Sequence, residues 1–184
     1  MKPTLVFAMK EEAQDVFDDY DVIFTGVGKV NAAYTLAKHI AEKKPQMIIN
    51  MGTAGSRKHA GGTVINPTQF VQRDMDVTAL GFEKYQTPFS TDPVVIEYGE
   101  RFAKLDTGVC GSGDDFATGD EAATFDCVDM EGHALSLVCQ REGVTFACLK
   151  YISDGADDNA DMDWNESLKT AAKALRKALE EAEL

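Results

Sequence analysis

Acidic side chains follow three apolar segments of the sequence, at the position where each segment ends. Asp154 closes the apolar run 144–152, Glu131 lies just after a second short run, and Glu12 follows the apolar N-terminal segment. The ligand crevice of an open α/β sheet lies at the ends of its strands, so we expect these carboxyl groups to converge there. Three converging carboxyl groups predict acid–base chemistry on a polar small molecule.

The turn from Gly26 to Lys29 does not have the sequence signature of a phosphate-binding loop. A Walker loop needs a glycine where Ile23 stands and a serine or threonine where Val30 stands, and Asn31 replaces the third glycine of a dinucleotide fingerprint. The glycines allow a tight turn between a strand and a helix, and they also allow the backbone to approach a ligand. The sequence leaves both interpretations open.

Metal sites and serine nucleophiles have no support in the sequence. His39, His59 and His133 lack metal-ligand spacing, and the acidic cluster 154–163 has no EF-hand frame. Ser153 lacks the G-x-S-x-G elbow of a hydrolase nucleophile. We therefore expect no metal and no cofactor, and paired carboxyl groups remain the favoured chemistry.

The composition is typical of one globular domain spanning residues 1–184. Hydrophobic residues make up 44% of the chain and charged residues 27%, with no repeat or linker that would divide it. The net charge of −13 argues against nucleic acid, which binds clustered lysine and arginine, and disfavours a highly phosphorylated substrate. The expected partner is a small molecule.

The cysteines and the N-terminus indicate a cytoplasmic protein. The four cysteines lie mostly in apolar segments without C-x-x-C spacing, which favours reduced thiols over disulfides. The apolar N-terminal run ends at Met9 and is too short for a signal peptide or a membrane span. We expect no membrane partner.

Apolar runs of strand length alternate with helical patterns along the chain. This alternation predicts an α/β fold, in which helices cover the faces of a mostly parallel sheet. The predicted strands span 4–8, 22–25, 46–51, 64–71, 105–110, 125–130 and 144–152. The predicted helices span 10–18, 29–44 and 134–141, with a turn at 52–55 and a long loop at 74–91.

The last helix has the clearest pattern in the sequence. Asp163 and Glu166 have the spacing of an N-terminal capping box. A single apolar stripe, which predicts an amphipathic helix, is formed by Leu168, Ala171, Ala172, Leu175, Leu179 and Ala182.

Seven short strings occur in order from the first strand to the last helix. They are AMKEE (8–12), GVGKVNAA (26–33), IINMGTAG (48–55), DVTALGF (76–82), SGDDF (112–116), DME (129–131) and ISDGAD (152–157). Together they resemble the purine nucleoside phosphorylase superfamily and, within it, the 5′-methylthioadenosine/S-adenosylhomocysteine nucleosidases. This resemblance covers essentially the whole chain and implies a single-domain α/β/α sandwich with a central mixed, mostly parallel sheet.

The resemblance implies a role for each carboxyl group. Asp154 would be the general acid that protonates N7 of the departing adenine, Glu12 would polarise the attacking water, and Glu131 would hold the ribose hydroxyls. Thr53, where the family usually has serine, would help position the water, and Lys150 stands where relatives carry an arginine near it. Glycosidic cleavage commonly uses one carboxyl group as acid and another to activate water on the opposite face.

Further residues are implied as contacts of the nucleoside. Phe116 would stack beside the purine, the main chain at Ala117 would read the base edge, and Ser153 would also contact the substrate. The pocket for the 5′ substituent would be lined by Met9, Val27, Met130 and Trp164, although residue type alone favours a core position for Met130 and Trp164. The resemblance also implies a homodimer, in which the neighbouring subunit's site receives Val77, Leu80 and Pro88.

Two departures from the resembled family affect what we expect. The chain is shorter, chiefly between the first helix and Val22, and Trp164 stands where a phenylalanine is usual, so its indole should narrow the 5′ pocket. We expect phosphate-independent release of adenine from 5′-methylthioadenosine, S-adenosylhomocysteine or 5′-deoxyadenosine. The alternatives are a phosphate-dependent purine nucleoside phosphorylase and a non-catalytic nucleoside-binding protein on the same fold.

Overall fold

The computed structural model describes residues 2–157 and 160–182, apart from the side chains of 160–163, 165 and 166. Its strands are β1 (Thr4–Phe7), β2 (Asp21–Phe24), β3 (Met47–Gly55), β4 (Val64–Gln72), β5 (Ile96–Glu97), β6 (Thr107–Ser112), β7 (Cys127–Asp129) and β8 (Thr145–Asp154). Its helices are α1 (Lys10–Ala13), α2 (Lys29–Lys43), α3 (Gly132–Glu142) and α4 (Ala160–Glu181), with short 3-10 helices η1 (Thr78–Leu80) and η2 (Ala122–Thr124).

The strands of the described chain form one mixed sheet. Its order is β2-β1-β3-β7-β6-β4-β5, and β8 pairs with both β3 and β4. The pairs β1–β2, β1–β3, β3–β8, β4–β6 and β6–β7 are parallel, whereas β3–β7, β4–β5 and β4–β8 are antiparallel. The predicted mixed, mostly parallel sheet is therefore confirmed.

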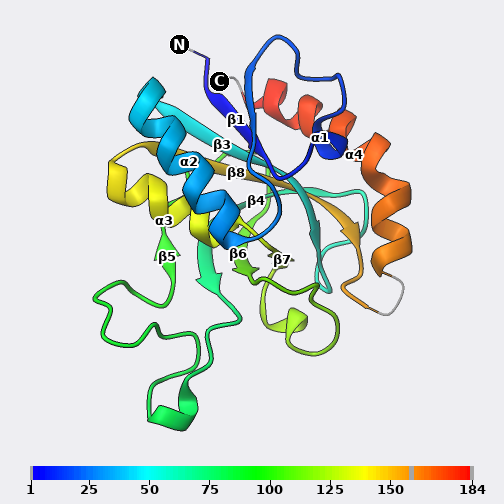
Figure 1. Cartoon of the computed structure of the whole chain (residues 1–184). Helices are drawn as coiled ribbons and strands as arrows, with labels where there is room; N and C mark the ends of the chain where they lie inside the picture. The colour runs from blue at the N-terminus through cyan, green and yellow to red at the C-terminus, as the bar shows by residue number, and fades with distance from the viewer. Residues whose placement is uncertain (1, 158–159, 183–184) are drawn as a thin grey trace.

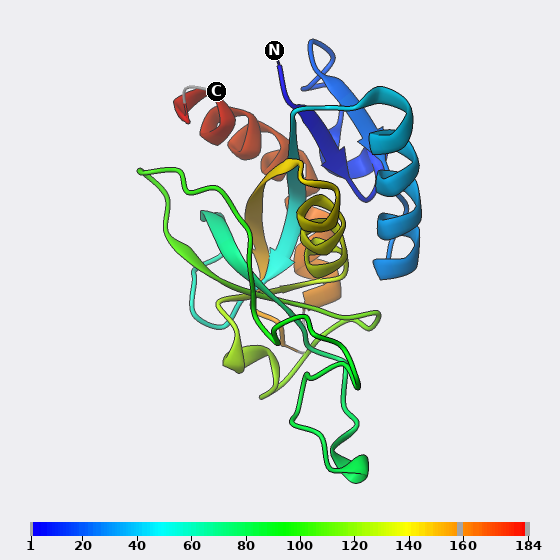
Figure 2. The same ribbon diagram turned by 90° about the vertical axis from the view of Figure 1, so that its left-hand side faces the viewer.

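Helices cover both faces of the sheet and make a three-layer α/β/α fold (Figure 1). Helices α2 and α3 pack together on one face, and α4, with α1 beside it, packs on the other. Figure 2 shows the sheet between these two layers. Leu36 of α2 and Leu135 of α3 belong to one buried core, and Leu175 and Leu179 of α4 belong to the core on the opposite face.

Helix α4 confirms the apolar stripe predicted for the end of the chain. Ala171, Ala172, Leu175 and Leu179 are buried against the sheet, as expected for an amphipathic helix. The helix begins at Ala160, earlier than the predicted capping position. The expected capping box of Asp163 and Glu166 falls on side chains outside the described part of the chain.

The helix predicted over 10–18 is wrong in its length, because α1 ends at Ala13. Gln14 adopts a positive φ of 49°, which closes the helix, and the chain then turns. Phe17 reaches the core from this turn, and its ring centroid lies 5.1 Å from that of Phe7. The second half of the predicted helix is therefore a turn that buries Phe17.

The turn predicted at 52–55 is also wrong, because β3 continues through these residues to Gly55. Gly52 and Gly55 suggested a turn by their type, but both lie in the strand and pair with β8. The short edge strand β5 has no predicted counterpart in the sequence.

The segment between β4 and β5 is a long loop that reaches away from the rest of the molecule, drawn in green in Figures 1 and 2. It contains η1 and an edge-to-face pair between Phe82 and Phe89. Leu80 and Phe89 are 74% and 93% exposed, so the loop presents apolar side chains to solvent. None of the helices in the described ranges combines the length and apolar character needed to cross a membrane.

Candidate active site

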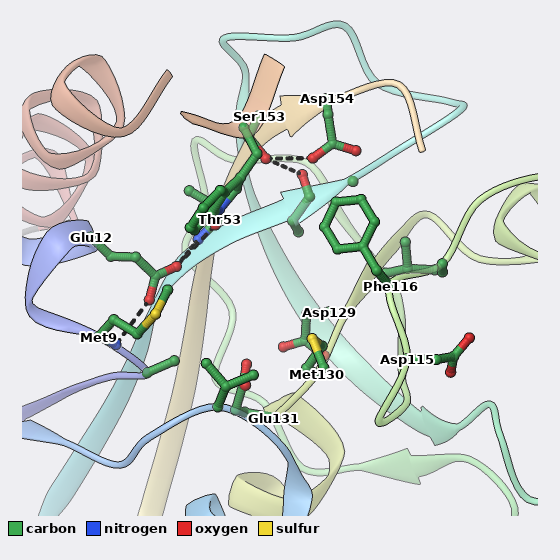
Figure 3. A pocket seen from close by; sticks show the side chains of 17 residues that line it. Met9, Glu12, Thr53, Asp115, Phe116, Asp129, Met130, Glu131, Ser153 and Asp154 are labelled. Carbon is green, nitrogen blue, oxygen red and sulfur yellow. Dashed lines mark hydrogen bonds between the residues drawn. The ribbon is translucent and has the colours of Figure 1, made fainter. Parts of the chain in front are cut away.

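The three carboxyl groups singled out by the sequence face one cavity, with a volume of about 280 Å³. Figure 3 shows Glu12, Glu131 and Asp154 on three different sides of it. The predicted site residues that line this cavity are Met9, Glu12, Val27, Thr53, Phe116, Ala117, Met130, Glu131, Ser153, Asp154 and Trp164. Met130 and Trp164 are therefore only partly buried lining residues, and not core residues as their types alone suggested.

Glu12 is a buried side chain in the first turn of α1. Its Oε1 accepts hydrogen bonds from the main-chain N–H and from Oγ1 of Thr53, both at 2.9 Å. Its Oε2 lies 3.4 Å from the N–H of Met9, the residue that caps α1, as the glutamate of a capping box does. Helix α1 and β3 together hold the carboxylate at one end of the cavity.

The close contact between Glu12 and β3 depends on Gly52. A Cβ at this position would lie 2.9 Å from Glu12 Oε1, closer than real Cβ atoms approach a neighbour. Any side chain at Gly52 would therefore displace the carboxylate. The glycine that suggested a turn in the sequence instead makes room for the Glu12 carboxylate.

Asp154 is the last residue of β8 and is buried at the other side of the cavity. Its Oδ2 accepts a hydrogen bond of 2.7 Å from Ser153 Oγ, and its Oδ1 accepts one of 2.9 Å from the N–H of Ala156. A Cβ at Gly55 would lie 2.6 Å from Asp154 Oδ1, so this second glycine of β3 is also required.

A register shift in the sheet sets the direction of the Asp154 side chain. Ala54 pairs with Ile152, but Gly55 pairs with Asp154, so Ser153 is passed over in the pairing of β3 with β8. Such irregularities re-aim side chains and are frequent next to active sites. Ser153 and Asp154 are consequently both presented to the cavity.

Glu131 lies between β7 and α3 and connects the site to the turn before α2. Its Oε1 accepts a hydrogen bond of 2.8 Å from the main-chain N–H of Gly28. Gly28 has a φ of 93°, a conformation that favours glycine, and Val27 beside it lines the cavity. The glycine turn, for which the sequence left two interpretations open, therefore has its backbone at the site.

Asp129, which lines the cavity, forms a buried ion pair with Lys150 behind it. Lys150 Nζ lies 2.8 Å from Asp129 Oδ2, which also accepts a hydrogen bond of 2.9 Å from the N–H of Gly132. Burial opposes ionisation of Asp129. The positive charge of Lys150, together with the hydrogen bonds that Asp129 accepts from Lys150, Ser112 and Gly132, nevertheless holds the pKa of this carboxyl below its usual value. Lys150 was expected among the substrate contacts. It does not line the cavity, and instead supports the segment that carries Met130 and Glu131.

The segment that carries Phe116 and Ala117 is held by Arg73, which the sequence did not identify. The buried Arg73 guanidinium lies 2.9 Å from Asp115 Oδ1 and also donates to the Asp115 carbonyl oxygen. A Cβ at Gly113 would lie 2.7 Å from Arg73 Cζ, so the guanidinium packs directly on the backbone. No sequence motif marks this arginine, because its role depends on a partner in a distant loop.

The predicted contacts with a neighbouring subunit lie away from this cavity. Val77, Leu80 and Pro88 belong to the long loop between β4 and β5, and they do not line the site of their own chain. Within the described residues, no cluster of three or more histidine, cysteine, aspartate or glutamate side chains has the arrangement of a metal site.

Comparisons with known proteins agree with this fold. Residues 20–182 match the phosphorylase superfamily. The 5′-methylthioadenosine/S-adenosylhomocysteine nucleosidase of Actinobacillus succinogenes is 34% identical over 169 residues, which cover 81% of this chain and 74% of that protein. A nucleosidase of the same name from a Geobacillus strain is 30% identical over 177 residues, which cover 84% and 76%.

Solved structures extend the similarity to the whole chain. The Helicobacter pylori 5′-methylthioadenosine/S-adenosylhomocysteine nucleosidase with butyl-thio-DADMe-Immucillin-A has a TM-score of 0.89 and 26% identity, and the match covers 100% of this chain and 99% of that one. The native futalosine hydrolase of Helicobacter pylori strain 26695 also has a TM-score of 0.89 and 26% identity, with coverage of 100% and 98%. The chain belongs to the phosphorylase superfamily and, within it, to the family of the 5′-methylthioadenosine/S-adenosylhomocysteine nucleosidases.

Proposed function

We propose that the protein hydrolyses the N-glycosidic bond of a 5′-modified adenosine and releases adenine and the free sugar. The observation that carries this proposal is the placement of two buried carboxyl groups, Glu12 and Asp154, at different sides of one cavity. The names of the relatives support 5′-methylthioadenosine and S-adenosylhomocysteine as substrates, and futalosine is named for one structural neighbour. A role in methionine salvage is part of this proposal.

The proposed mechanism assigns the two carboxyl groups to opposite ends of the reaction. As the bond between C1′ and N9 breaks, the sugar gains oxocarbenium character and the purine gains electrons. Asp154 delivers a proton to N7 of the purine, which makes adenine a better leaving group. Glu12 accepts a proton from the water whose oxygen attacks C1′. Thr53 holds the Glu12 carboxylate in place through two hydrogen bonds.

Substrate binding is assigned to the remaining lining residues. Phe116 is 52% exposed and offers a ring face to the purine, with the main chain of Ala117 at the base edge. Glu131 holds the ribose hydroxyls. The 5′ substituent lies among Met9, Val27, Met130 and Trp164, and the indole of Trp164 limits its size.

The lining favours water over phosphate as the nucleophile. A phosphorylase needs several basic side chains around the anion. Among the described residues, those that line the cavity include no lysine, arginine or histidine, and Lys150 behind them is bound to Asp129. Phosphate would also lie beside the carboxylates of Glu12 and Glu131.

We therefore expect adenine release from 5′-methylthioadenosine to proceed without phosphate. The measurement follows free base by chromatography for a panel of nucleosides, with and without added phosphate. The expected product is the free sugar in both conditions. A strict need for phosphate, with a ribose 1-phosphate as the product in place of the free sugar, would assign the protein to the phosphorylases. Binding without release of the base would identify a nucleoside-binding protein.

Nucleoside binding should depend on pH through Glu131. Burial raises the pKa of Glu131 to about 7, and repulsion by the Asp129 carboxylate contributes to the rise. Glu131 is therefore protonated below this pH and ionised above it, and the ionised form accepts hydrogen bonds from both ribose hydroxyls. We expect the KM for 5′-methylthioadenosine to fall as the pH rises through about 7.

The matched variant for this pH dependence is Glu131→Gln, whose amide does not titrate. Its KM should be high and nearly constant over about one pH unit either side of neutrality. An unchanged KM of the native protein over the same range would show that ionisation of Glu131 does not control binding.

We also propose that the protein is a cytoplasmic homodimer in which the loop between β4 and β5 completes the neighbouring site. The exposed Leu80 and Phe89 support a partner surface on this loop, since exposed apolar side chains gathered on one segment mark interaction sites. The four cysteines are free and buried, which suits a reducing compartment.

The dimer should be seen at micromolar concentration by sedimentation or light scattering. Leu80→Asp should shift the protein toward monomer and lower activity, because the loop would no longer cover the partner's site. The exposed Leu80 lies outside its own chain's cavity, so folding should be preserved. A fully active monomer would contradict the shared site.

A further inference from the structure

Trp164 makes a polar contact that goes beyond lining the cavity. Its indole Nε1 lies 2.9 Å from Thr53 Oγ1, and the same Oγ1 lies 2.9 Å from Glu12 Oε1. The three side chains come from α4, β3 and α1, so the contact links three elements distant in the sequence. Thr53 and Trp164 are also two positions at which the sequence departs from the family it resembles, and this hydrogen bond joins them.

The chemistry of the three groups fixes the direction of this hydrogen-bond chain. An indole N–H only donates, so the Thr53 hydroxyl oxygen must accept from it. The hydroxyl proton is then directed to the third group, and the nearest acceptor is Glu12 Oε1. An ionised carboxylate only accepts, so both ends of the chain require the same direction.

This direction distinguishes the two oxygens of the Glu12 carboxylate. Oε1 receives two hydrogen bonds of 2.9 Å, from the main chain and the hydroxyl of Thr53. Among the described residues, Oε2 has only the 3.4 Å contact with the N–H of Met9. Oε2 is therefore the oxygen with free capacity to accept a proton from a water molecule.

We propose that Trp164 is a positioning residue for hydrolysis: its indole N–H orients the Thr53 hydroxyl toward Glu12 and so fixes which carboxylate oxygen faces the nucleophilic water. This inference rests on the proposed role of Glu12. Without the indole donor, the Thr53 hydroxyl is free to rotate and to bind the water itself. The carboxylate then loses its fixed orientation, and alignment of the water with C1′ is lost with it.

The competing role for Trp164 is that of a wall of the 5′ pocket. A wall acts on binding, so its removal changes KM and the preference among 5′ substituents. A positioning donor acts on the bound complex, so its removal lowers kcat. The two roles therefore differ in the kinetic constant that they affect.

The kinetic test compares Trp164→Phe, Thr53→Val and the double variant on 5′-deoxyadenosine, whose small 5′ group makes least use of the wall. Trp164→Phe keeps an aromatic ring and removes the N–H. We expect kcat to fall roughly tenfold, as for loss of a hydrogen bond to a charged network, with KM within about twofold. The double variant should be no slower than Thr53→Val alone, because the indole then has no hydroxyl to orient.

Thr53→Ser is the matched control, because it keeps the hydroxyl that receives and passes on the hydrogen bond. In the Thr53→Ser background, Trp164→Phe should again lower kcat, whereas in the Thr53→Val background it should not. The ratio of kcat/KM for S-adenosylhomocysteine to that for 5′-deoxyadenosine reports the wall role separately, since the positioning effect cancels in the ratio.

A spectroscopic readout tests the hydrogen bond without relying on activity. Trp164 is the one tryptophan of the chain, so a ¹⁵N-labelled sample gives one indole N–H resonance. This resonance should move upfield in Thr53→Val and stay near its native position in Thr53→Ser. It also shows whether each variant is folded.

The outcomes separate this inference from the proposed function. Independent, multiplicative effects of the two substitutions, or a change in KM and substrate ratio with unchanged kcat, would overturn the positioning role and leave Trp164 as a wall. An indole resonance that does not respond to Thr53→Val would overturn the hydrogen bond itself. Failure of the native protein to release adenine without phosphate would instead refute the proposed function.

Discussion

Replacement of Asp154 by asparagine should lower kcat by about 10²–10⁴-fold, the range typical for loss of a general acid. The amide preserves the size of the side chain. Its oxygen can accept from the N–H of Ala156, 2.9 Å from Oδ1 in the native protein, and its NH₂ can donate to Ser153 Oγ, 2.7 Å from Oδ2. It cannot deliver a proton to N7, so adenine would have to leave as an anion. Nucleoside affinity should stay close to native, because no lining atom is removed.

The measurement is single-turnover release of adenine together with nucleoside affinity from calorimetry. Asp18→Asn, the same substitution at an exposed position between α1 and β2, serves as the control for loss of one negative charge. It should have native kinetics. An Asp154→Asn variant within a few-fold of the native rate would remove Asp154 from the role of acid.

Replacement of Glu12 by glutamine should be almost as damaging, again with little effect on binding. The amide oxygen can take the place of Oε1 and accept from the N–H and hydroxyl of Thr53. The NH₂ group would then stand in place of Oε2. An amide NH₂ group cannot accept a proton from water. We expect kcat to fall by about 10²–10⁴-fold, as for loss of a general base.

Glu11→Gln is the matched control for this change, because Glu11 is the neighbouring residue of α1 and points to solvent. It should leave kcat and KM as in the native protein, whereas Glu12→Gln should retain the nucleoside without turning it over. If Glu12→Gln weakened binding and kept its turnover number, Glu12 would be a substrate contact and not the group that activates water.

The positions of the three carboxyl groups were predictable because each follows an apolar run. The carboxyl ends of parallel strands meet at one edge, which brings Asp154 of β8 to the end of β3. Glu131 follows β7, which runs antiparallel to β3 and reaches the site because Val128 pairs with Gly55. Glu12 followed from the same rule applied to β1. The resemblance to known families added a role for each group, which the apolar pattern alone does not provide.

The supporting contacts were not predictable, because they depend on distances across the fold. Nothing in the sequence around Arg73 indicates that it will form an ion pair with Asp115. Lys150 is expected to contact the substrate until the fold shows that it pairs with Asp129. Gly52 and Gly55 predicted a turn because glycine is common in turns. Their actual role depends on which side chains approach β3, and a local pattern contains no such information.

Gly52 and Gly55 have a consequence for how substrate range can change. The carboxyl groups of Glu12 and Asp154 both rest on the bare backbone of β3, against glycines three residues apart. A strand rises about 3.3 Å per residue, so the backbone sets a span of about 10 Å between the two contact points. Substitution of side chains elsewhere does not alter that span.

The distance between the proposed water end and the proposed purine end of the reaction is therefore a property of the main chain. The 5′ end of the cavity is different, because side chains such as Met9, Val27 and Trp164 form it. Point mutations can reshape this end freely while the span along β3 stays constant. New substrates for this scaffold should accordingly vary in their 5′ group and keep the same separation between sugar and base.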